Sequence, residues 1–194
     1  MAFLRVENTP LSSSVFSMLE IPVEIMSEIF THCLPESICA PDIKNAPLLL
    51  TRVSRRWRTI ALSTPVLWRS LGITSSKSST HLLKLDAWLS RARNQPLYLS
   101  FDATIDSGSM DILNRHAEMW YDMTITGQHL SQLALLNPNT TCLRILQRLD
   151  ISIRSGSGIE LAVPTFQDAP ALRHLQIHFL ANTIVSQIVL PWEN

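Results

Sequence analysis

The sequence predicts a protein of mixed helix and strand, in the α+β or α/β class, with a small helical unit followed by a partial, irregular array of short parallel strands. Three observations lead to this class. Apolar residues recur at helical spacing in two segments near the N-terminus. Four trios of alternating apolar residues follow, centred on Leu99, Met123, Ile151 and Ile177, so that successive centres lie 24, 28 and 26 residues apart. A polar segment, residues 74–80, separates the two patterns.

Composition and charge narrow the class of protein. Of the 194 residues, 46% are hydrophobic and 16% charged, as is typical of a folded chain. Sixteen basic and sixteen acidic residues cancel, so the net charge indicates no nucleic-acid partner. The N-terminus does not resemble a secretory signal, and no run of about 18 apolar residues exists, so no membrane contact is expected. The three cysteines, Cys33, Cys39 and Cys142, are interpreted as free buried thiols in a reducing compartment, the cytoplasm or the nucleus.

The helical unit is expected over residues 19–73, after a flexible lead-in at 1–18. Its first helix is predicted to begin at Ile21 and Pro22, since proline is well tolerated in a first turn. Pro35 ends this helix. Its apolar face follows the three-and-four spacing of a helix and consists of Ile25, Met26, Ile29, Phe30 and Cys33.

A second helix is predicted to begin at Pro47, after a proline-rich loop at 35–47, and to end at Ser63–Pro65. The short segment after Pro65 is expected to fold Leu67 and Trp68 back onto the two helices. The second helix carries one continuous apolar stripe, made of Leu48, Leu49, Val53, Trp57, Ile60 and Ala61.

The polar residues 74–80 form a linker and the predicted domain boundary. From 81 to 194 the chain alternates helix-like segments with the strand-like trios. Their spacing matches the about 20 to 29 residues of leucine-rich repeats, each of which adds one short parallel strand. No regular asparagine position and no polar end cap are visible, so the array is predicted to be irregular and truncated or uncapped at its C-terminus.

Two motifs in the helical unit carry a resemblance to a known family. The segments IPVEIMSEIF (21–30) and LLLTRVSRRWRTIALSTPVLWRSL (48–71) resemble an F-box, in particular the variant abundant in mushroom-forming fungi. Ile21 stands where that family usually has leucine, and Ser54 where its second motif has cysteine. The family's motif of proline, any residue, leucine and tryptophan is intact. The resemblance extends loosely through residues 88–97.

The resemblance implies an adaptor role without catalytic residues. An F-box binds a Skp-type adaptor and, through it, a cullin in an SCF-type (Skp–cullin–F-box) ubiquitin ligase, while C-terminal repeats hold a protein substrate. The matched positions imply adaptor contacts from Ile21, Pro22, Val23, Ile25, Ile29, Val53 and Trp57, with Leu67 and Trp68 closing the helical unit. The side chains expected on the substrate-facing side of the strands are Tyr98, Ser100, Asp122, Thr124, Ser152, Gln176 and His178.

A non-catalytic repeat scaffold is the alternative. In it the helical unit packs internally, all its apolar residues are core, and no ligase is recruited. No enzyme activity, cofactor or metal site is predicted in either case, because the chain lacks a nucleophile elbow, a phosphate loop and paired zinc-ligand spacing. The arginines of the second helix are interpreted as a solvated face rather than a nucleic-acid contact. They are Arg52, Arg55, Arg56 and Arg58.

Overall fold

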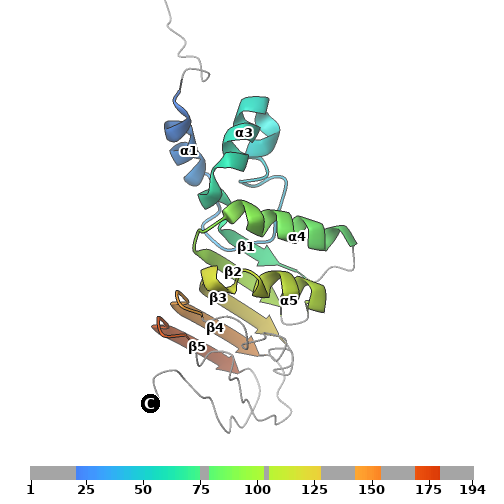
Figure 1. Cartoon of the computed structure of the whole chain (residues 1–194), viewed down its shortest axis with the longest axis vertical. Coiled ribbons are helices and arrows are strands. Elements are labelled where there is room, and N and C mark those ends of the chain that lie inside the picture. Colours follow the sequence, from blue (N-terminus) through green and yellow to red (C-terminus); the bar gives the residue numbers. More distant parts are fainter. Residues whose placement is uncertain (1–20, 75–78, 103–104, 128–142, 154–168, 180–194) are drawn as a thin grey trace, which may run out of the picture.

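The described part of the chain folds into a helical unit and a five-stranded parallel sheet, which Figure 1 shows in chain order from blue to red. The computed structural model describes residues 21–74, 79–102, 105–127, 143–153 and 169–179. The predicted class of mixed helix and strand with parallel strands is confirmed.

The helical unit contains four short helices. They are α1 (Val23–Thr31), α2 (Leu50–Val53), α3 (Arg55–Ser63) and the 3-10 helix η1 (Pro65–Trp68). The first lies where the sequence predicts a helix, directly after Pro22, and it buries Met26 and Phe30. Figure 1 shows α1 and α3 at the same end of the molecule, away from β5.

The prediction of one continuous second helix is wrong, because α2 and α3 are separate. Between them Ser54 adopts an extended conformation (φ −155°, ψ 167°), and its hydroxyl accepts a hydrogen bond from the Trp57 backbone N–H at 3.1 Å. Serine is a favourable N-cap because this bond satisfies a donor that the helix itself leaves unpaired. The break also divides the predicted stripe, since Leu49 and Val53 are exposed while Ile60 and Ala61 are buried.

The five strands lie in chain order, and each pairs in parallel with the next. They are β1 (Ser70–Ile73), β2 (Leu97–Asp102), β3 (Trp120–Gly127), β4 (Arg148–Ile153) and β5 (His174–Phe179). Parallel neighbours require a crossover connection. Helix α4 (Ser79–Ala92) lies on the crossover from β1 to β2, and α5 (Ser107–Asn114) with the 3-10 helix η2 (Ala117–Met119) on the next. Figure 1 shows α4 and α5 side by side along the strands.

The register aligns apolar residues across the sheet. One row consists of Leu71, Leu99, Met123, Leu149 and Leu175, and the other of Ile73, Phe101, Ile125, Ile151 and Ile177. All four predicted strands are present. However, the centres of the second and third trios, Met123 and Ile151, do not pair with each other. Met123 lies opposite Leu149 instead. Between the four predicted strands the paired positions of the first row therefore recur at 24, 26 and 26 residues, more evenly than the trio centres, and β1 adds an interval of 28.

The alternate positions of the strands form a second side of the sheet, which we call the polar face. Its first row consists of Ser70, Tyr98, Asp122, Arg148 and His174. Its second row consists of Gly72, Ser100, Thr124, Asp150 and Gln176. Successive side chains of a strand point to opposite sides. The apolar rows therefore join the core with α4 and α5, while the described polar-face side chains, Gly72 aside, are half-buried or exposed.

One hydrophobic core joins the helical unit to the sheet. Trp68 of η1 is fully buried, and its ring lies 4.9 Å from that of Trp88 on α4. The Trp88 Nε1–H donates to the Trp68 carbonyl oxygen at 2.9 Å. The predicted boundary at 74–80 therefore does not separate two cores: β1 lies before it yet pairs with β2, and α4 already begins at Ser79. Four residues next to a polar segment carry too little pattern to indicate a strand.

The loop at 35–47 covers part of the outer edge of β1. The Gly72 N–H donates to the Cys39 carbonyl oxygen at 2.8 Å. A Cβ at Gly72 would lie 2.6 Å from the Cys39 carbonyl carbon and 2.7 Å from the Ala40 nitrogen. Only glycine permits this approach of loop to strand. The contact satisfies one backbone N–H of the edge strand β1. An unpaired N–H at a sheet edge could instead pair with a strand of another chain.

Some sequence expectations lie outside the described residues: the lead-in at 1–18, Cys142 and the segment after 179. Cys33 and Cys39 are described, and both are exposed, so the prediction of buried thiols is wrong for them. The reason is that α1 ends before Cys33, which therefore leaves the buried side of that helix. Among the described helices, none has the length and apolar character needed to cross a membrane.

Candidate interaction surface

Large exposed apolar side chains are concentrated in the helical unit. Eight such residues occur in the described parts of the chain, and all but Leu83 of α4 lie between residues 23 and 62. The seven are Val23, Ile25, Ile29, Ile43, Leu49, Val53 and Leu62. Single exposed apolar residues are common on proteins, but their concentration in one small unit makes the helical unit a candidate interaction surface.

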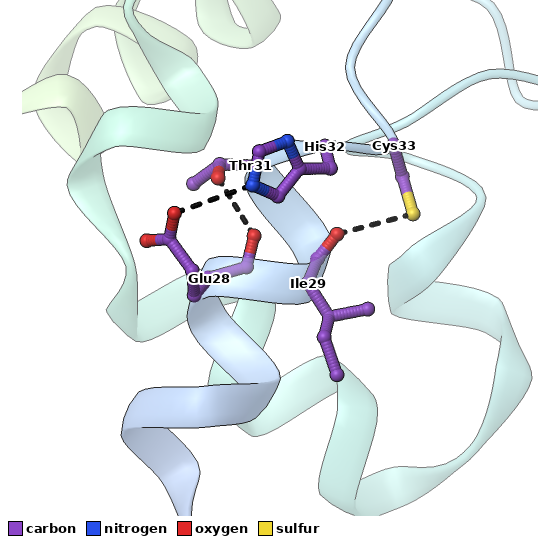
Figure 2. Close-up of polar contacts among 5 residues, drawn as sticks. All are labelled: Glu28, Ile29, Thr31, His32 and Cys33. Atoms are coloured by element: carbon purple, nitrogen blue, oxygen red, sulfur yellow. Dashed lines mark hydrogen bonds and ion pairs between the residues drawn. The ribbon is translucent and has the colours of Figure 1, made fainter.

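Helix α1 is apolar on more than its buried side. Met26 and Phe30 are buried in the core, whereas Ile25 is 54% exposed and Ile29 is 44% exposed. Figure 2 shows the Ile29 side chain pointing away from the polar contacts that end the helix. In those contacts Glu28 pairs with His32 at 3.3 Å, and the Cys33 Sγ–H donates to the Ile29 carbonyl oxygen at 3.4 Å. The two isoleucines are thus held on a regular helix with about half of each side chain exposed.

The remaining predicted contacts of the first segment lie at the start of α1. Ile21 is half-buried, and its carbonyl oxygen accepts a hydrogen bond from the Arg56 guanidinium of α3. Pro22 and Val23 are exposed, and the Pro22 carbonyl oxygen accepts from the Met26 N–H at 3.0 Å. The start of α1 is therefore held to α3 by a hydrogen bond to its backbone, Ile21 packs against the core, and the side chains of Pro22 and Val23 are exposed.

The second segment contributes Val53 and Trp57 from two different helices. Val53, at the end of α2, is 54% exposed. Trp57, in the first turn of α3, is half-buried, and its ring centroid lies 4.9 Å from that of Phe30. Trp57 thus links α3 to α1 and retains an accessible part, whereas Val53 contributes little to the core.

Leu67 and Trp68 differ from the other predicted contacts because both are completely buried. The Trp68 Nε1–H donates to the Ala61 carbonyl oxygen at 2.8 Å, and the Arg91 guanidinium lies 4.7 Å from the centroid of its ring. Neither residue offers a surface to a partner in this arrangement. Their position is that of residues that close the helical unit onto α4.

The arginines of α2 and α3 have two kinds of surroundings. Arg56 and Arg58 form hydrogen bonds with backbone carbonyl groups. The Arg56 guanidinium donates to the Ile21 carbonyl oxygen, and the Arg58 Nε–H donates to the Thr51 carbonyl oxygen at 2.7 Å. Arg52 and Arg55 are exposed on either side of Val53. Two of the four thus have structural roles that the sequence pattern does not reveal.

The polar face of the sheet is the second candidate surface. All seven residues expected on the substrate-facing side do lie on it, since Ser152 and His178 pair in its third row. Sequence reasoning missed the charged members Arg148 and Asp150 of the same face. Their signal is the alternation of β4, in which every second residue after Arg148 is polar.

Charges on the polar face interact across strands. Arg148 Nε lies 3.7 Å from Asp122 Oδ2. Burial raises the pKa of the Asp122 carboxyl, Arg148 lowers it by a smaller amount, and the neighbouring Asp150 raises it. Asp150 Oδ1 is buried and has no hydrogen-bond partner among the described residues. The ion pair of Arg148 with Asp122 therefore leaves the Asp150 carboxylate without a pairing charge among the described residues of this part of the face.

No metal-binding cluster of three or more histidine, cysteine or carboxylate side chains occurs within the described ranges. His174 and His178 lie on the same face of β5, four residues apart, as their strand spacing predicts.

Compared with known proteins, the chain matches no family model, no curated protein and no solved structure.

Proposed function

We propose that this protein is the substrate-recognition adaptor of an SCF-type ubiquitin ligase. The helical unit, as an F-box, binds a Skp-type adaptor and through it a cullin, and the sheet belongs to an irregular leucine-rich array that holds a protein substrate. The observation that carries the proposal is the exposure of Ile25, Ile29 and Val53, which the F-box resemblance matches to adaptor contacts. The role requires no catalytic residue or cofactor, and it agrees with a cytoplasmic or nuclear location.

The difference in exposure among the matched residues supports the proposal. Those expected to meet a partner keep accessible surface, whereas those expected to close the unit, Leu67 and Trp68, are completely buried. Tryptophan with arginine at its side is a frequent combination in binding hot spots, and Trp57 lies between Arg56 and Arg58 on α3. An apolar helix such as α1 suits a partner that offers an apolar groove.

The repeat part of the proposal is supported by the order of the strands. A leucine-rich array adds one parallel strand per repeat, each beside the one before it. The five strands follow that order at intervals of 24 to 28 residues between paired positions.

The alternative, a scaffold whose helical unit packs internally, requires Ile25, Ile29 and Val53 to be core residues. Each is between 44% and 54% exposed, although the core beside them is otherwise well buried. This exposure favours the adaptor.

The test is capture of a Skp-type adaptor by the full chain. Ile25→Asp is expected to reduce capture at least about ten-fold, because a charge buried in an apolar contact costs more than the ~1.4 kcal/mol of a ten-fold change. Leu83→Asp is the matched control, since Leu83 is an equally large exposed residue that lies on α4 rather than the helical unit. Affinity is measured by calorimetry with purified proteins, and circular dichroism verifies that both variants fold. Equal binding by Ile25→Asp and wild type, or no binding by wild type, would refute the proposal.

A further inference from the structure

Two hollows lie at opposite ends of the first row of the polar face. One has a volume of about 320 Å³, is bounded by the loop at 35–47, and includes Ser70 and Tyr98 in its lining. The other has a volume of about 400 Å³ and includes Arg148 and His174 in its lining. These residues belong to one cross-strand row, in which Asp122 lies between them.

The row has a length that suits an extended peptide. From β1 to β5 there are four inter-strand intervals of about 4.8 Å, or about 19 Å in total. An extended chain advances about 3.3 Å per residue, so about six residues cover the row. A segment of that length, laid across the strands, would place one side chain in each hollow.

The hollow near β4 and β5 has the chemistry of an anion site. Arg148 and Arg173 both line it, and among the described lining residues Asp150 is the one carboxylate. The ion pair of Arg148 with Asp122 is long, at 3.7 Å, and among the described residues the Arg173 side chain makes no hydrogen bond or ion pair. Charge-assisted bonds from arginine are about 2.7–2.9 Å long, so donors on both guanidinium groups are still uncommitted.

The charge of this hollow selects a singly charged group. Among the described lining residues, two arginines and one aspartate leave a formal charge of +1, with histidine counted as neutral; Asp122, which shares Arg148 at 3.7 Å, is outside this lining. One carboxylate balances that charge. A nucleic acid is disfavoured because three carboxylates, those of Asp102, Asp122 and Asp150, lie on the same face and would repel successive phosphates.

The hollow at the other end has a partly apolar lining. Leu34, just before the loop, and Ile38 within it are half-buried there, and Trp88 of α4 also belongs to the lining. The Tyr98 ring forms its border with the sheet, where the Arg69 guanidinium lies 5.1 Å from the ring centroid and the Tyr121 ring lies 5.3 Å away. A large apolar side chain entering this hollow would complete the burial of Leu34 and Ile38.

We propose that the polar face binds an extended protein segment that carries a bulky apolar side chain and, about five residues away, a carboxylate. The apolar side chain occupies the hollow at the 35–47 loop, and the carboxylate pairs with Arg148 and Arg173. This inference rests on the proposed function, since it defines the chemistry of the protein substrate that the array holds.

The test uses the full chain and the peptide acetyl-Trp-Ser-Gly-Ser-Gly-Glu-amide, together with the same sequence reversed, in calorimetric titrations. At least one direction is expected to bind, and glutamine in place of glutamate or alanine in place of tryptophan is expected to weaken binding five-fold or more. The double variant Arg148→Gln with Arg173→Gln is expected to lose the same factor. The matched double variant Arg52→Gln with Arg55→Gln removes two exposed charges from the helical unit and is expected to bind as wild type does.

Several results would overturn the inference. They are absence of binding by both peptides at millimolar concentration, equal binding of the glutamate and glutamine peptides, and tighter binding of a lysine peptide. Tighter binding of a phosphoserine peptide or of a six-nucleotide oligothymidylate would also overturn it. Adaptor capture separates this inference from the proposed function: Ile25→Asp is expected to keep peptide binding, and Arg148→Gln with Arg173→Gln is expected to keep adaptor capture.

Discussion

At the scale of single residues, polar side chains decide where helices begin. Asp106 caps α5: its Oδ1 accepts from the Ser109 N–H at 2.9 Å, and its Oδ2 accepts from the Ser109 hydroxyl at 2.7 Å. Ser54 caps α3 in the same way and thereby separates it from α2. Each cap satisfies a backbone donor that the helix leaves unpaired. At Ser54 the cap begins a new helix, so that Val53, at the end of α2, is exposed while Ile60 and Ala61 of α3 are buried.

The Asp106 cap yields a prediction about stability and its dependence on pH. Asp106→Ala is expected to lower the free energy of unfolding by about 1 kcal/mol, because the cap bonds are lost. The hydrogen bond from Ser109 lowers the pKa of the Asp106 carboxyl from its ordinary value of 3.8, and burial opposes that shift. A lowered pKa in the folded state contributes stability above pH 3.8 that is lost as the pH falls through the folded-state value.

Urea denaturation at pH 7 and at acidic pH measures both effects. Asp106→Asn serves as the control, since its amide oxygen still accepts from the Ser109 N–H and most of the stability at pH 7 is expected to remain. An alanine variant as stable as the asparagine variant would contradict the capping role.

At the scale of elements, close backbone contact holds the 35–47 loop to β1. Gly72 makes this contact, and its importance follows from distances of 2.6–2.8 Å between a built Cβ and backbone atoms of residues 39 and 40. Backbone atoms cannot rotate away as the end of a side chain can. The loop also borders the first hollow, so its position on β1 determines the shape of that site.

Gly72→Ala is therefore expected to displace the loop and to lower the free energy of unfolding by about 1–3 kcal/mol, the usual cost of overpacking. Gly108→Ala is the matched control. The nearest atoms to a Cβ at Gly108 are all in side chains: the two Leu82 methyl groups at 3.0 and 3.4 Å and the capping Asp106 Oδ1 at 3.2 Å. Side chains can shift where backbone cannot, and alanine favours the helix in which Gly108 lies. Thermal unfolding compares the two variants. Equal stability of both would contradict the packing of the loop on β1.

At the scale of the whole molecule, the helical unit and the sheet share one core. Trp68 connects them, through its bond to Ala61 within the helical unit and its contacts with Trp88 on α4. The strand β1 connects them a second time, because it follows η1 directly and pairs with β2. A fragment that ends at the linker would expose both contacts, which is why the adaptor and peptide experiments use the full chain.

Trp68→Ala is expected to destabilise the whole protein by about 3–5 kcal/mol, because a large ring is lost from a fully buried position. Helical and sheet signals in circular dichroism are expected to be lost in a single transition that coincides with the change in tryptophan fluorescence. Two separate transitions, with the sheet more stable than the helices, would show that the two parts fold independently.

The sequence by itself determined which segments form helices and which form strands. The spacing of apolar residues along a short segment differs between the two, so this information is local. The positions of α1, of α4 and of four strands all follow from the spacing of apolar residues, and the residues of the polar face follow from alternation. Sequence likeness also marked Ile25, Ile29 and Val53 as contacts for a partner, although their spacing on apolar helices is equally consistent with core.

Only the tertiary structure decided which apolar residues are buried, where the parts join and which charges meet. Exposure of Ile25 beside buried Met26 depends on what packs against α1, and the pairing of β1 with β2 joins residues 28 apart along the chain. The proximity of Arg148 to Arg173 depends on strand register. These properties arise from contacts between segments distant in sequence, and no local pattern encodes which segments meet.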